Sequence, residues 1–141
     1  MKIRKSSATW EGGLKEGQGT IALGGGKIEV PYDFGARFED GAGSNPEELI
    51  GGAHAGCFSM SLSAGLSRAG FTPQLIQTVA HVTLDKVDGK SRITQIHLEC
   101  EAEAPGIDPE TFAKIAEDSK SNCPVSAALA GVKISLDAKL S

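Results

Sequence analysis

Alternating apolar and polar positions are clearest in residues 91–104. From residue 96 to residue 104 every second side chain is apolar and belongs to one face: Ile96, Leu98, Cys100, Ala102 and Ala104. The side chains between them are polar: His97, Glu99, Glu101 and Glu103. This alternation is typical of a strand with one buried face and one solvated, acidic face. Residues 74–86 form the preceding arm, and Asp88-Gly89 favours a two-residue turn, so we predict a β-hairpin. Cys100 lies on the buried face, where we interpret it as an inert core residue.

Shorter stretches predict the remaining strands. Glycine clusters separate β-branched and apolar residues into three segments, residues 2–12, 17–23 and 27–32. A predicted loop follows these strands from Pro31 to Gly43. Apolar residues alternate with polar ones again in residues 132–140, which predicts a final strand with one buried face.

The longest predicted helix lies between Gly43 and Gly70. Asn45 and Pro46 suit its start, and a capping box of Ser44 with Glu47 would suit it equally well. Its interior consists largely of Gly, Ala and Ser, and it holds no charged residue between Glu48 and Arg68. Each internal Gly costs about 0.8–1 kcal/mol of helix stability relative to Ala, so close approach by another backbone is expected. We predict a central helix buried nearly all round, against a sheet or a second subunit.

A second helix begins at Asp108-Pro109 and breaks before Cys123-Pro124, because proline disfavours helical geometry at the residue that precedes it. A short helix from residue 124 to about 129 follows. The predicted order is βββ-α-ββ-α-β with a mostly antiparallel sheet around the central helix. This is the α+β class.

Composition and charge narrow the possibilities. The 141 residues, 40% hydrophobic and 23% charged, suit one globular domain spanning residues 1–141. The net charge of −4 gives no reason to expect nucleic acid or an anionic membrane as partner. No apolar run approaches the roughly 20 residues that span a bilayer, and the first residues are not those of a signal peptide. We therefore expect a cytoplasmic protein.

Two of the three cysteines are candidates for chemistry. Cys123 precedes a helix, whose dipole and free N–H groups favour a thiolate. Cys57 lies within the central helix, where an apolar setting raises a thiol's pKa, so it needs a nearby cation; Arg37, in the predicted loop, is a candidate. His54 lies one turn before Cys57 on the same face. A thiol–disulfide pair and two buried spectator thiols both fit these observations.

Four motifs resemble the OsmC/Ohr family of osmotically inducible and organic-hydroperoxide-resistance proteins. They are Arg37-Phe38-Glu39, Asn45–Gly51, His54–Met60 and Asn122–Ser126. The resemblance covers essentially the whole chain, and His54 with the Arg-Phe-Glu loop is more similar to the OsmC branch.

The resemblance implies an OsmC-like fold in an intertwined homodimer, with its sites at the interface. It implies a thiol-dependent peroxidase that reduces organic hydroperoxides and takes part in stress defence. Cys57 matches the cysteine that attacks the peroxide and becomes a sulfenic acid, and Cys123 the cysteine that resolves it to a disulfide. Arg37 matches the arginine that stabilises the thiolate, and Glu47 the glutamate that orients this arginine. A dithiol, such as a lipoylated protein, would reduce the disulfide, and neither metal nor organic cofactor is implied.

Helix geometry adds a hypothesis to this resemblance. Glu47 and Cys57 are ten residues apart on one predicted helix, which separates their backbones by roughly 15 Å. A glutamate so placed does not easily hold an arginine beside the Cys57 of its own helix. We therefore expect Arg37 and Glu47 to serve the cysteines of the partner subunit.

Three other interpretations are open. A non-enzymatic ligand-binding or structural dimer of the same fold would need neither thiol. A cysteine hydrolase would use Cys57 with His54 but lacks an evident third group. A zinc site would use His54, Cys57 and Cys123. We interpret His54 as a packed helix histidine rather than a catalytic base.

Overall fold

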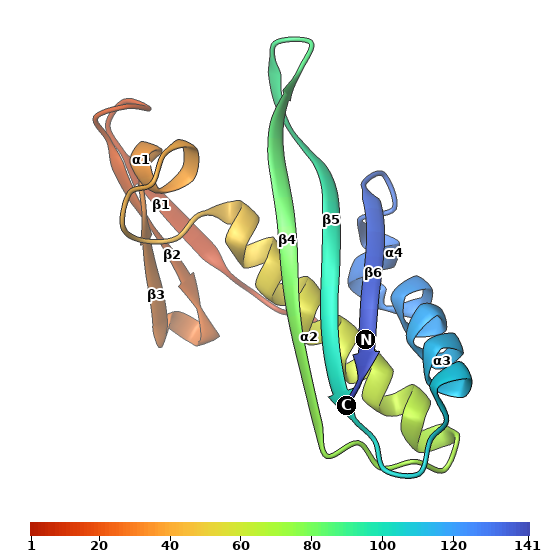
Figure 1. Cartoon of the computed structure of the whole chain (residues 1–141). Helices are drawn as coiled ribbons and strands as arrows, with labels where there is room; N and C mark the ends of the chain where they lie inside the picture. The colour runs from red at the N-terminus through yellow and green to blue at the C-terminus, as the bar shows by residue number, and fades with distance from the viewer. The chain divides into compact units, whose positions relative to one another are not determined.

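The computed structural model describes all residues from Met1 to Ser141, in two compact units, residues 1–49 and 50–141. The first unit holds a three-stranded antiparallel sheet in the order β1-β2-β3 (Figure 1). Its elements are β1 (Ser7–Glu11), β2 (Gln18–Leu23), the 3-10 turn η1 (Gly24–Gly26), β3 (Ile28–Tyr32) and α1 (Phe34–Phe38). The prediction of a single domain stays a prediction.

Two predictions for the first unit are wrong in detail. The first strand begins at Ser7 rather than at residue 2, because its pairing with β2 stops at Ser7 opposite Ala22, and β2 itself ends one residue later, at Leu23. The predicted loop contains the short helix α1. Asp33 caps it, since its Oδ1 accepts a hydrogen bond from the Ala36 N–H at 2.8 Å.

The long helix α2 (Pro46–Arg68) begins and ends where the sequence predicts. Asn45 provides the cap, because its Oδ1 accepts from the Glu48 N–H at 2.7 Å. The alternative capping box is absent, since Ser44 donates to the Glu48 carboxylate instead. At the other end Gly70 has a φ of +92°, and the Phe71 N–H closes the last turn on the Leu66 carbonyl at 2.9 Å.

The two faces of α2 differ in burial. One face is buried, through residues that include Phe58, Leu62 and Leu66. A second face is exposed in the single chain and carries small or apolar residues: Gly52, Ala53, Gly56, Met60 and Ala64. Within the single chain the sheet and helices cover only one side of α2, and burial of the other side by a second subunit stays a prediction.

The second unit contains the predicted hairpin, formed by β4 (Leu75–Val87) and β5 (Lys90–Glu103) (Figure 1). Asp88 and Gly89 both have positive φ, 52° and 77°, as a tight two-residue hairpin turn requires. The final strand β6 (Lys133–Leu140) pairs with β5 in parallel. Three of the four strand pairs in the molecule are antiparallel, so the predicted α+β class and mostly antiparallel sheets are confirmed.

The predicted apolar face of the second arm is the inner face of this sheet. Its residues Ile96, Leu98, Cys100, Ala102 and Ala104 are all buried, with exposures from 0% to 5%. They pack in one core with the apolar residues of α2 and with Phe112 and Ala116 of α3 (Pro109–Asn122). Asp108 caps α3 by accepting from the Thr111 N–H at 3.0 Å.

Close packing of α2 against α3 depends on Gly65. A Cβ atom there would lie 2.9 Å from Ile115 Cγ2 and 3.4 Å from Ser119 Oγ. The helices approach this closely only with glycine, and the approach brings the end of α3 beside α2. The short helix α4 (Pro124–Ala128) follows at that end. No helix of the structure has the length and hydropathy needed to cross a membrane.

Candidate functional site

Cys57 and Cys123 face each other in the second unit. Cys57 lies in α2 and is partly exposed, whereas Cys123 lies between α3 and α4 and is 0% exposed. Pro124 keeps Cys123 out of helical geometry, at φ −58° and ψ 126°, as the sequence predicts. Both thiols are free, and they lie near enough to shift each other's pKa. This arrangement suits thiol–disulfide chemistry.

The surroundings shift the two thiols in opposite directions. Burial raises the pKa of Cys57, and interaction with the Cys123 thiol raises it further, against smaller lowering effects of the Val125 N–H and the Ser61 hydroxyl. Burial also raises the pKa of Cys123, but hydrogen bonding by the Cys57 thiol and by the N–H groups and hydroxyl at the start of α4 outweighs burial. The pKa of Cys123 is therefore lowered, the direction expected for a thiol that precedes a helix.

His54 is fully buried one turn before Cys57. Its Nε2 lies 2.7 Å from Ser126 Oγ in α4, and its Nδ1 is buried without a partner. Burial lowers the pKa of His54, so the neutral imidazole is favoured. The sequence interpretation of a packed histidine missed Ser126, although Ser126 follows Cys123 by the three residues that separate His54 from Cys57.

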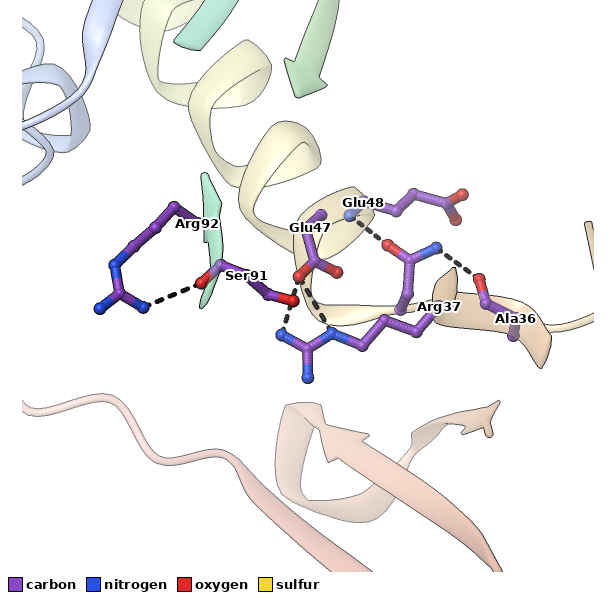
Figure 2. Close-up of polar contacts among 7 residues, drawn as sticks. Ala36, Arg37, Glu47, Glu48, Ser91 and Arg92 are labelled. Atoms are coloured by element: carbon purple, nitrogen blue, oxygen red, sulfur yellow. Dashed lines mark hydrogen bonds and ion pairs between the residues drawn. The ribbon is translucent and has the colours of Figure 1, made fainter. Parts of the chain in front are cut away.

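Arg37 and Glu47 pair within the first unit (Figure 2). Nε and Nη2 of Arg37 both donate to Glu47 Oε1, at 3.0 Å and 2.9 Å. Glu47 is 6% exposed, and its Oε2 has no partner, whereas the Arg37 side chain is 38% exposed. Asn45 strengthens the local structure, because its Nδ2 donates to the Ala36 carbonyl at 3.0 Å. The caps of α1 and α2 thus hold the two charged residues at neighbouring helix ends.

Two of the alternative site chemistries lack their geometry. No cluster of three His, Cys, Asp or Glu side chains is placed to hold a metal ion, so His54, Cys57 and Cys123 do not form a zinc site in this structure. The hydrolase would need an imidazole hydrogen-bonded to its thiol. In the structure the His54 ring bonds Ser126 and leaves its other nitrogen unpartnered.

Comparison with known proteins agrees with this architecture. The family model described as OsmC-like protein matches residues 39–137. Peroxiredoxin OsmC of Escherichia coli (strain K12) is 51% identical over 138 residues, which cover 97% of this chain and 96% of that protein. The uncharacterized protein YmaD of Bacillus subtilis (strain 168) is 27% identical over 140 residues, covering 94% of this chain and 91% of YmaD.

Solved structures share the fold at lower identity. A crystal structure of an OsmC-like protein from Mycoplasma pneumoniae has a TM-score of 0.76 and 16% identity, over 99% of this chain and 97% of that one. The organic hydroperoxide resistance protein OhrB of Bacillus subtilis has a TM-score of 0.69 and 21% identity, over 97% of this chain and 98% of that one. The matched family model and the near full-length identity lead to one conclusion: the chain belongs to the family of OsmC-like proteins.

Proposed function

We propose that this protein is a thiol-dependent peroxidase that reduces organic hydroperoxides in stress defence. The observation that carries the proposal is the pair of free, facing thiols of Cys57 and Cys123. The 51% identity between this chain and Peroxiredoxin OsmC of Escherichia coli, over nearly the whole length of both, supports the proposal. Organic hydroperoxides are the substrate class implied by the OsmC/Ohr resemblance.

We propose Cys57 for the first step, and exposure supports this choice, because a peroxide can approach a partly exposed thiol more readily than the fully buried Cys123. The Cys57 thiolate attacks the peroxide, a new S–O bond forms, and the O–O bond breaks. Cys57 becomes a sulfenic acid, and the alkoxide takes up a proton and leaves as an alcohol. Cys123 then forms the disulfide, water is released, and a dithiol such as a lipoylated protein restores both thiols.

Arg37 and Glu47 complete the proposed site. Burial and the neighbouring Cys123 thiol raise the pKa of Cys57, so formation of its thiolate near neutral pH needs a nearby cation. Arg37 is oriented by two hydrogen bonds to one oxygen of Glu47, and its Nη1 makes no hydrogen bond within the chain. We propose that this guanidinium stabilises the Cys57 thiolate of the partner subunit.

The exposed face of α2 supports the homodimer on which this role depends. Gly52 and Gly56 on that face would meet nothing within 4 Å if a Cβ were added. Each therefore lowers helix stability by about 0.8–1 kcal/mol relative to Ala without serving a contact inside the chain. Met60 is 76% exposed on the same face. We propose that a second copy of α2 packs here, where small residues permit close approach.

We also propose the cytoplasm as the location of the protein. All three cysteines are free, and an odd number of cysteines suits a reducing compartment, where thiols persist.

Intact-mass spectrometry of the reduced protein after one equivalent of cumene hydroperoxide tests the function. The wild type should lose two hydrogens, Cys123→Ser should gain one oxygen, and Cys57→Ser should not change in mass. Cys100→Ser is the matched control, since Cys100 is a core thiol, and it should behave as the wild type. An unreactive wild type would refute the peroxidase and favour the non-enzymatic dimer.

A further inference from the structure

Two side-chain pairs connect α2 with the segment that carries Cys123. His54 and Cys57 are three residues apart on α2, and so are Cys123 and Ser126 on the opposing segment. Cys57 faces Cys123, and His54 faces Ser126 at 2.7 Å. The two contacts therefore lie side by side, one redox-active and one polar.

The polar contact is well isolated from water. His54 is 0% exposed and Ser126 is 7% exposed. Theirs is the only hydrogen bond between nitrogen or oxygen atoms of side chains that joins α2 to α3 or α4. A buried hydrogen bond of this kind restricts the position of α4, and with it the adjoining Cys123, relative to Cys57.

We propose that His54 and Ser126 are positioning residues for the resolving step, in which Cys123 attacks the sulfenic acid of Cys57. The inference rests on the proposed peroxidase function and deepens it. It assigns a role in the reaction to a histidine and a serine that touch neither the peroxide nor the reacting oxygen.

The direction of the hydrogen bonds follows from the burial of the imidazole. The Nδ1 of His54 has no partner. A buried N–H group without an acceptor is less tolerated than a buried ring nitrogen without a donor, so the proton belongs on Nε2 rather than on Nδ1. Nε2–H then donates to Ser126 Oγ, which leaves the hydroxyl hydrogen of Ser126 to donate elsewhere. We take the sulfur of Cys123, three residues earlier at the start of α4, as its acceptor, because the Ser126 side chain lowers the pKa of Cys123.

The hydrogen bonds from His54 to Ser126 and from Ser126 to Cys123 assist the formation of the disulfide. The Cys123 sulfur attacks the Cys57 sulfur, an S–S bond forms, and the S–O bond breaks. Cys123 is oxidised and the sulfenic sulfur is reduced, while the departing hydroxide combines with the thiol proton of Cys123 as water. A hydroxyl that donates to the Cys123 sulfur stabilises its thiolate, which is the attacking form. His54 acts one bond further away, by holding the Ser126 hydroxyl in this orientation.

Rapid-quench intact-mass spectrometry with cumene hydroperoxide separates the two steps. The oxygen adduct reports attack by Cys57, and the later loss of that oxygen as water reports resolution by Cys123. In Ser126→Ala we expect the first rate to stay within about twofold of the wild type and the second to fall about tenfold or more. His54→Leu should show the same selective loss, and the double variant should be no slower than the slower single variant.

Rescue and control variants distinguish positioning from a general loss of structure. Ser126→Thr keeps the hydroxyl and His54→Gln keeps an N–H donor, so both should recover most of the resolution rate. Ser121→Ala removes an exposed serine from the same segment and should match the wild type in both steps.

The outcomes separate the two proposals. Resolution at the wild-type rate in Ser126→Ala, or equal slowing of both steps, would refute the positioning role while the peroxidase stands. A wild type that never gains oxygen would refute the peroxidase, and the positioning role with it.

Discussion

Replacing Glu47 with glutamine tests whether the Arg37–Glu47 pair activates Cys57. Both bonds from Arg37 end on the same oxygen, Glu47 Oε1, at 3.0 Å and 2.9 Å. Glutamine keeps the size of the side chain and removes its charge. Glu48→Gln provides the matched control, because Glu48 is the next residue of α2, is exposed, and bonds Ser44 rather than Arg37.

The size of the effect follows from the exposure of the pair. Hydrogen bonds to charged groups contribute about 1.5–3 kcal/mol. The Arg37 side chain is 38% exposed, so water competes for it, and we take the lower end of that range. If loss of its orientation costs Arg37 a similar amount of thiolate stabilisation, about 1.5 kcal/mol, the pKa of Cys57 rises by about one unit. At a pH below that pKa, attack on the peroxide should slow about tenfold.

The assay follows the oxygen adduct of Cys123→Ser, which stops after the first step, between about pH 5 and pH 9. Adding Glu47→Gln should move the midpoint of the rate profile up by about one unit and leave the plateau at high pH unchanged. Adding Glu48→Gln should leave the midpoint in place. An unmoved midpoint in Glu47→Gln, or an equal shift in both variants, would show that the pair does not act on the thiolate.

Two further predictions concern stability and assembly. Burial lowers the pKa of His54 in the folded protein, so below its ordinary value of 6.5 the unfolded chain binds a proton that the folded chain does not. The free energy of unfolding should therefore fall on acidification below pH 6.5, by up to about 1.4 kcal/mol per pH unit more than in His54→Gln. Urea unfolding of both proteins at pH values above and below 6.5 measures this difference. Equal pH dependence of the two proteins would contradict the prediction. Met60→Lys would bury a charge if α2 packs against a second copy, and should weaken the dimer by at least about a hundredfold in analytical ultracentrifugation. Ala113→Lys, on the exposed side of α3, should have no such effect, and an unchanged dimer in Met60→Lys would exclude this face from the interface.

Local rules predicted most of the backbone correctly. The hairpin of β4 and β5 follows from strict alternation and from Asp88-Gly89, whose positive φ angles match the turn that this pair favours. The ends of α2 follow in the same way from Asn45 and Gly70. These features depend on residues within one turn of each other, so the sequence contains the whole cause.

Features that depend on distant residues were not predictable from such rules. Ser126 lies 72 residues after its partner His54, and no local pattern indicates that a mid-helix histidine will meet a serine of another helix. The sequence did not distinguish Gly65 from the other small residues of α2. Only the position of Ile115 in α3 shows that a glycine is needed there. The residues alone indicated Cys57, Cys123 and Arg37 as candidates. Their roles, and Glu47 itself, came from the family resemblance, because composition and spacing left the two thiols with several interpretations.

The opposite shifts of the two thiols carry a consequence for the whole reaction. The surroundings lower the pKa of Cys123, which is fully buried, and raise that of Cys57, which is partly exposed. The surroundings within one chain thus favour the thiolate of Cys123, the proposed resolving residue, and the protonated thiol of Cys57, the proposed attacking residue. If Arg37 reaches Cys57 from the partner subunit, as we propose, the first step requires assembly whereas the second does not. Dissociation by dilution should then slow the oxidation of Cys57 before it affects closure of the disulfide, and this order would link peroxidase activity to the dimer.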